Sequence, residues 1–178
     1  YCLGLLHAWR MVRQVSLKNI IWLGPVVFLL HDLEEVFWTR LWIEKNRFLF
    51  EDTQFEGVIE AMGYQPAKFG LVVAVITILY GIISYFATRH IQAGLSMNLY
   101  VSTLLILFVN VFTHAGQTAL LGMYTPGVVT ALLVVLPYTA IAFRTLKAHR
   151  LLTRTTWKTS PFLSVGMLVV IFGLMIVI

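Results

Sequence analysis

The feature that most constrains this chain is a succession of long apolar runs. A helix needs about 20 predominantly apolar residues to cross the hydrocarbon core of a membrane. Five runs approach or exceed that length, and they cover residues 18–42, 69–88, 97–122, 127–143 and 161–178. The apolar share of 59% exceeds the roughly 45–50% of soluble domains, which excludes a soluble domain, a disordered tail and a coiled coil. The predicted fold class is an all-α integral membrane bundle with five transmembrane helices, or six if a further span follows.

Basic residues between the runs indicate which side of the membrane each connection faces, because cytoplasmic connections carry an excess of Lys and Arg. Nine lie on the side of the N-terminus, namely Arg10, Arg13, Lys18, Arg89, Arg144, Lys147, Arg150, Arg154 and Lys158. Four lie on the other side, namely Arg40, Lys45, Arg47 and Lys68. We therefore predict a multi-pass protein of the cell (inner) membrane with a cytoplasmic N-terminus. The net charge of +5 is a topology signal, and no nucleic-acid partner is expected.

The whole chain, residues 1–178, is expected to form one transmembrane domain with two segments at the membrane surface. Residues 1–15 mix large apolar side chains with arginines, which predicts an interfacial helix. Residues 43–68 form an extracytoplasmic loop with a capping-box pattern at 53–56. Apolar residues follow at helical spacing and predict a short amphipathic helix, with a plain connector as the alternative. The single cysteine, Cys2, excludes an internal disulfide and a cysteine-based zinc site.

Four ionisable residues interrupt the first apolar run, namely His31, Asp32, Glu34 and Glu35. Insertion scales assign a mid-span Asp a cost of about 2.5–3.5 kcal/mol, so such residues are kept for function more often than for stability. At about 100° per residue, His31, Glu34 and Glu35 share one helix face, and Asp32 lies off it. The alternative is that the two glutamates sit at the water interface of the membrane.

The third run supplies a matching polar face. Asn110 and His114 are four residues apart and therefore adjacent on a helix. They lie 13 and 17 residues beyond the start of their run, as His31 and Glu35 do in the first run. Because the first and third spans run in the same direction, both pairs should reach the same depth. We predict one intramembrane site from these four residues together with Glu34.

Three further residues are predicted to contact a substrate: Trp38, Gln117 and Tyr138. Trp38 lies on the same helix face as the His-Glu-Glu residues and is either an interfacial anchor or a pocket wall. Gln117 continues the polar face of the third run, and Tyr138 lies on roughly one side of the fourth run with Thr130.

The first chemistry that this set permits is metal catalysis. The H-x-x-E-E string resembles the H-x-x-E-H zinc string with its last His replaced by Glu. Transferred to this chain, His31 and Glu35 would bind a metal and Glu34 would be the general base. His114 would complete a two-histidine, one-carboxylate set with room for water. Zinc, iron or manganese would suit these donors.

The second chemistry is acid–base catalysis with no cofactor. Two adjacent carboxylates titrate apart and provide an acid and a base, while Asn110 and His114 could stabilise an oxyanion. This logic resembles that of the CAAX-type membrane glutamate peptidases. Arg40 falls one place later than in their E-E-x-x-x-R pattern, and Asn110 stands where they have Phe. A third interpretation is an ion- or proton-coupled transporter, although the sequence has no visible internal repeat.

Three strings resemble the HXXEE-motif family of small bacterial and archaeal membrane proteins: HDLEE at 31–35, the stretch 110–114 and YTPG at 124–127. The resemblance covers roughly residues 20–145 and implies a multi-span bundle with His31, Glu34 and Glu35 at its centre. The family has no settled activity. From the site we expect a membrane-embedded (metallo)hydrolase acting on a lipid-like or other apolar substrate, with an isomerase or cyclase as the alternative. The bilayer and that substrate are the expected partners, and the oligomeric state is open.

Overall fold

The computed structural model describes residues 16–49 and 65–177, and within these ranges the chain is helical with no strand. The interfacial helix predicted for residues 1–15 and the amphipathic helix predicted after residue 53 lie outside the described residues. In chain order the elements are α2 (Leu17–Lys45), the 3₁₀ turn η1 (Arg47–Leu49), α4 (Pro66–Arg89), α5 (Leu95–Leu121), α6 (Val128–Thr130), the π-helical turn η2 (Ala131–Val135), α7 (Leu136–Ala148) and α8 (Arg154–Val177).

Four of these helical stretches are long and apolar enough to cross a membrane: α4, α5, the continuous stretch Val128–Ala148 and α8. The prediction of five or six such helices is therefore wrong for the described residues. The predicted span that does not meet this criterion is the first one, which corresponds to α2. Its 29 residues are long enough, but Asp32, Glu34 and Glu35 interrupt its apolar sequence. Because charged side chains are costly in lipid, α2 depends on the surrounding helices to cover its charged face.

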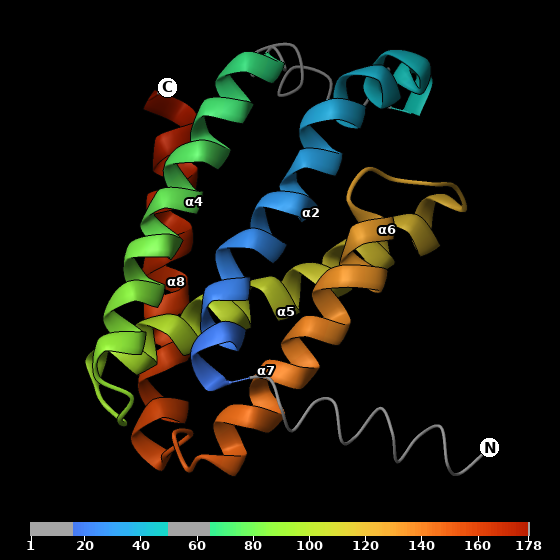
Figure 1. Ribbon diagram of the computed structural model, residues 1–178. Coiled ribbons are helices and arrows are strands. Elements are labelled where there is room, and N and C mark those ends of the chain that lie inside the picture. The colour runs from blue at the N-terminus through green and yellow to red at the C-terminus, as the bar shows by residue number, and fades with distance from the viewer. Residues whose placement is uncertain (1–15, 50–64, 178) are drawn as a thin grey trace, which may run out of the picture.

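The other helices provide that cover (Figure 1). α2 packs most extensively against α4 and also contacts α5, α6, η2 and α7. α4 and α8 lie side by side along one edge of the bundle, and α5 crosses obliquely behind α2. The stretch from α6 to α7 descends on the opposite side of α2 from α4. One face of the middle of α2 is thus covered by α4, α5 and the α6–α7 stretch, while Val26 and Leu30 on its outer face are exposed.

A buried tyrosine cluster fixes the first half of α2 against its neighbours. The hydroxyl groups of Tyr100 and Tyr138 are 2.7 Å apart, and Tyr138 donates a hydrogen bond of 3.1 Å to the carbonyl of Ile20. Gly24 makes this approach possible, because a Cβ atom there would overlap Tyr80 and lie 2.8 Å from the Tyr138 hydroxyl oxygen. The contact sets the height of α2 relative to α5 and α7.

The turn η2 interrupts the α-helical hydrogen bonds just before Pro137. Pro137 has no N–H to donate to the carbonyl four residues earlier. Leu136, the residue before it, donates to the carbonyl of Ala131, which is five residues earlier and not four. π-Helical turns of this kind occur frequently at functional sites. Here the turn directly follows Thr130, whose side chain and backbone face α2.

Candidate functional site

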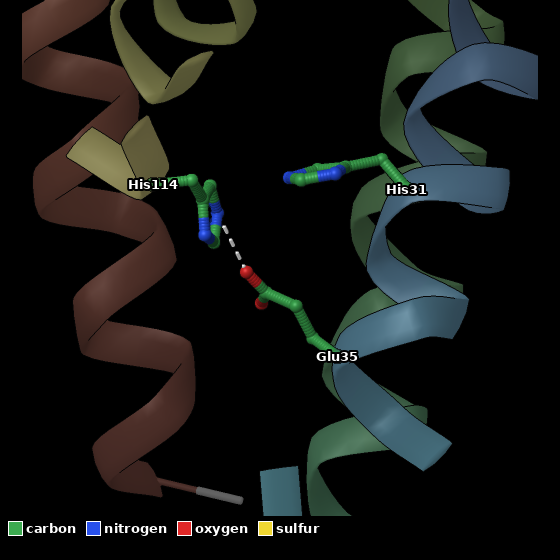
Figure 2. A group of neighbouring side chains, drawn as sticks. All are labelled: His31, Glu35 and His114. Carbon is green, nitrogen blue, oxygen red and sulfur yellow. Dashed lines mark ion pairs between the residues drawn. The ribbon is translucent and has the colours of Figure 1, made fainter. Parts of the chain in front are cut away.

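Three ionisable side chains from α2 and α5 meet in the interior, and we call them the His/Glu cluster: His31, Glu35 and His114. One potential ligand atom from each lies within 4.8 Å of those of the other two. Figure 2 shows His31 and Glu35 projecting from α2 toward His114. His114 Nε2 is 2.8 Å from Glu35 Oε1, and the two imidazole rings meet edge to face with centroids 4.9 Å apart. His31 is fully buried and His114 is 6% exposed, so the cluster is largely shielded by protein.

Hydrogen bonds to both ring nitrogens hold His31 in one orientation. Its Nε2 is 2.8 Å from the amide nitrogen of Asn110, and its Nδ1 is 2.8 Å from the hydroxyl of Thr130. The Asn110 amide nitrogen can only donate, so Nε2 accepts and Nδ1 carries the proton. Thr113 donates to the Asn110 side-chain oxygen at 3.0 Å, which is consistent with this orientation of the amide. The lone pair of Nε2 therefore points toward the α5 side of the site.

Glu34 links α2 to the segment between α5 and η2. Its Oε2 accepts hydrogen bonds from the hydroxyl of Thr130 at 2.6 Å and from the Thr130 backbone N–H at 2.8 Å. Its Oε1 accepts from the Tyr124 hydroxyl at 2.7 Å. With the contact from His31 to Thr130, these bonds form a relay from His31 through Thr130 to Glu34. Partners of this kind behind a histidine fix the ring tautomer and orientation.

The segment before α6 closes over the cluster at Gly127. Its φ of +89° is in the left-handed region that favours glycine. A Cβ atom there would overlap the His114 ring and lie 2.8 Å from His114 Nδ1 and 2.9 Å from Glu35 Oε1. Nδ1 of His114 is buried and has no hydrogen-bond partner among the described residues. The glycine therefore lets the backbone pass directly over the contact between His114 and Glu35.

Tyr124, in the same segment, is anchored at two points. Its carbonyl accepts a hydrogen bond of 2.6 Å from the indole N–H of Trp42, and its hydroxyl donates to Glu34. Partial burial and the hydrogen bond to the Glu34 carboxylate raise the pKa of the Tyr124 phenol above its ordinary value. The neutral phenol of Tyr124 therefore donates a hydrogen bond that holds the Glu34 carboxylate in place.

The structure brings together the five residues that the sequence assigned to one site: the His/Glu cluster, Asn110 at His31, and Glu34 one relay away. It places the three predicted substrate contacts elsewhere. Tyr138 is part of the buried tyrosine cluster, whereas Trp38 and Gln117 are exposed on their helices. None of these three has a side-chain hydrogen bond to the His/Glu cluster among the described contacts.

Two residues of the site were not among those predicted, namely Thr130 and Tyr124. Both lie more than 85 positions from their partner Glu34 in the sequence. The residues at 125–127 are typical of a chain reversal, but turn chemistry does not identify the helix that the segment contacts. Only the packing of α6 on α2 shows that these hydroxyl groups reach Glu34.

Two imidazoles and one carboxylate can hold a divalent metal, or they can exchange protons directly. The fold and the site define the class: a helical membrane protein with a polar His/Glu site enclosed between its helices. Within that class, the chain belongs to the family described as "Protein of unknown function with HXXEE motif", whose model matches residues 22–142. This confirms the resemblance inferred from the motif. No curated protein and no solved structure matches the chain.

Proposed function

We propose that this protein is a membrane-embedded hydrolase for a lipid-like or other apolar substrate, with a divalent metal held by His31, Glu35 and His114. The observation that carries the proposal is the convergence of the three ligand-type atoms within 4.8 Å of one another. Two histidines and one carboxylate are a common donor set of catalytic zinc sites, which keep a further position open for water.

The separations within the His/Glu cluster suit this role after a small adjustment. Metal–ligand bonds of about 2.0–2.2 Å place tetrahedral ligands roughly 3.4 Å apart. The contact of 2.8 Å between His114 and Glu35 would open slightly, and the longest separation would close by side-chain rotation. The relay through Thr130 to Glu34 already holds the His31 ring with Nε2 as the unprotonated nitrogen, which is the form that binds metals.

The remaining residues take roles that follow from their contacts. A bound metal would supply a nucleophile by lowering the pKa of its water. Asn110 now donates to His31 Nε2; once a metal takes that position, its amide is free to donate to a developing oxyanion. Glu34, which the sequence suggested as the base, accepts three hydrogen bonds. In our proposal it positions His31 through Thr130.

Metal analysis combined with an esterase assay tests this proposal. Purified protein should contain about one divalent metal per chain and hydrolyse p-nitrophenyl myristate, an apolar model ester. Glu35→Ala and His114→Ala should lose both the metal and the hydrolysis. His90→Ala is the matched control, because His90 is an exposed histidine outside the cluster. Wild-type protein that hydrolyses the ester without metal would refute the metal-dependent mechanism.

One observation favours a second candidate, a metal-free isomerase or cyclase. His114 and Glu35 already form a direct imidazole–carboxylate contact of 2.8 Å, which is the arrangement of a general acid–base pair. Such an enzyme would move a proton on the substrate without activating water. It would be metal-free, would release no acid from the ester, and would still depend on Glu35 and His114.

We also propose that the protein lies in the cell (inner) membrane with the N-terminal end of α2 on the cytoplasmic side. The α4–α5 and α7–α8 connections lie at that end of the bundle (Figure 1), and the basic residues concentrate there. The test uses a Cys2→Ser background. With an impermeant maleimide added to intact cells, Met123→Cys should be labelled and Gln92→Cys should be protected. The reverse pattern would refute the orientation.

A further inference from the structure

An apolar cavity of about 360 Å³ lies between α4, α5 and α8. Its lining residues are almost all apolar, and they include Phe28, Leu107, Phe162, Gly166 and Met167. A cavity without polar partners is a poor site for water. A lining of this kind favours an apolar ligand such as hydrocarbon.

The cavity arises because α5 and α8 are joined at one end and separate beyond it. Close contacts between small polar residues join them: Ser160 Oγ is 3.1 Å from the Asn98 carbonyl, and Ser164 Oγ is 3.1 Å from the Ser102 carbonyl. Small and hydroxyl side chains at such positions let membrane helices approach closely. Beyond this contact α5 crosses toward α6 while α8 continues along α4 (Figure 1), and the cavity occupies the space between them.

The inner wall of the cavity adjoins the candidate site on two helices. Phe28 precedes His31 by three residues on α2, and Leu107 precedes Asn110 by three residues on α5. Residues three apart on a helix are neighbours on its surface, with a rise of about 4.5 Å between them. The hydrogen bond between His31 and Asn110 therefore lies about one helical turn beyond the wall formed by Phe28 and Leu107.

We propose that this cavity binds the hydrocarbon chain of the substrate while the substrate's polar group reaches the His/Glu cluster. The inference rests on the proposed function. It assigns the substrate class as a single-chain amphiphile, such as an ester of one fatty acid. An apolar cavity of about 150 Å³ holds the six carbons of benzene, so 360 Å³ holds in proportion about 14 carbons. That volume matches one chain of this length.

The cavity is also accessible from the side of the bundle. Phe162 and Val170 line it and are 81% and 56% exposed at the outer face of α8. In a membrane this face meets lipid, so a chain can enter the cavity at α8 without its hydrocarbon part passing through water. The polar group would then travel toward α2, where the His/Glu cluster lies.

Gly166 offers a way to fill the cavity without disturbing the backbone. It lines the cavity, and a Cβ atom built there meets no described atom within 4 Å. Gly173, two turns further along α8, is equally unobstructed but does not line the cavity. Gly166→Leu and Gly173→Leu are therefore a matched pair: both add the same side chain to the same helix, and only the first occupies the proposed site.

The test is photolabelling of purified protein with a diazirine derivative of tetradecanol, in a bile-salt detergent that has no alkyl chain of its own. Wild type and Gly173→Leu should be labelled on α4, α5 and α8, and excess tetradecanol should compete. The competed labelling is the part of the signal that excess tetradecanol removes. In Gly166→Leu it should be at least about fivefold weaker than in wild type. Ile106→Trp, which fills the cavity from α5, should do the same if Gly166→Leu fails to fold. Equal competed labelling in the cavity-filling and control variants would overturn the inference.

The outcomes also separate this inference from the proposed function. His114→Ala should lose metal and hydrolysis while retaining the competed labelling, because the cavity is built from other residues. Competed labelling in a protein without metal or hydrolysis supports the cavity and refutes the hydrolase. A metal-containing hydrolase whose labelling is the same in Gly166→Leu and Gly173→Leu refutes the cavity alone.

Discussion

Replacing Gly127 by alanine should damage the candidate site through two separable effects. The first is backbone strain, because φ is +89° and a non-glycine residue in the left-handed region costs roughly 1–2 kcal/mol. The second is steric, because the new Cβ would overlap the His114 ring and lie 2.9 Å from Glu35 Oε1. The surrounding segment is fixed by Tyr124 and Thr130, so the His114 and Glu35 side chains must move apart. We expect a loss of metal affinity and of hydrolysis of at least about tenfold, comparable to the 10–100-fold losses caused by disturbing the partners of metal ligands.

Gly122→Ala isolates the first effect. Its φ of +63° is also left-handed, and a Cβ atom there meets no described atom within 4 Å. Both variants should therefore lower the melting temperature in detergent, but only Gly127→Ala should lose metal in the purified protein. If Gly127→Ala retains metal and hydrolysis to the same extent as Gly122→Ala, the close approach of the backbone to the His/Glu cluster has no functional role and the reasoning is refuted.

Three further predictions concern the supporting contacts. Thr130→Val breaks the relay to Glu34 without changing side-chain size and should reduce metal affinity about 10–100-fold; Thr130→Ser should restore it in the same binding titration. Because the pKa of Tyr124 is raised, its phenol stays neutral to a higher pH than an ordinary tyrosine. Glu34→Gln removes the neighbouring negative charge. The tyrosinate absorbance that disappears in Tyr124→Phe should therefore emerge at lower pH in Glu34→Gln, and an unchanged curve would contradict the contact. Gly24→Ala should destabilise the protein by about 1–3 kcal/mol through overpacking against the tyrosine cluster, whereas Gly81→Ala, in an open helical position, should stabilise it slightly; equal effects in thermal unfolding would refute this explanation.

The pairing of α2 with α5 could be predicted because helical rise is constant. Residues at equal distances from the starts of two parallel spans reach similar depths, and His31 and Asn110 are indeed hydrogen-bonded at 2.8 Å. Glu35 and His114, which also lie at equal distances from those starts, are likewise in contact at 2.8 Å. In both cases the spacing within each helix is local information, and the starts and directions of the two spans had to be inferred.

The structure does not bring the three predicted substrate contacts to the His/Glu cluster. Tyr138 shares a side of its helix with Thr130, but eight residues correspond to about 12 Å along a helix, which places it beside Tyr100 rather than Glu34. Trp38 and Gln117 are each three residues beyond a member of the His/Glu cluster, yet both side chains are exposed. A shared face does not determine depth, and this site occupies little more than one helical turn.

The predicted number of membrane-spanning helices was wrong because of the charged residues in α2. Its length and apolar content resemble those of a span, but the charges at 32–35 break the apolar stretch. The contacts of Thr130 and Tyr124 with Glu34 could not be predicted, because they depend on how the segment before η2 folds back onto α2. Sequence spacing within each element carries no information about that approach.

The central claim is that His31, Glu35 and His114 bind a metal ion, and X-ray absorption spectroscopy of the purified wild-type protein tests it most directly. We predict about one divalent metal per chain, coordinated by two imidazole nitrogens and at least one oxygen at about 2.0–2.2 Å, with the imidazole signal reduced in any metal that His114→Ala retains. Protein that is folded and hydrolytically active but contains no metal, or whose metal has no imidazole ligand, would contradict the claim.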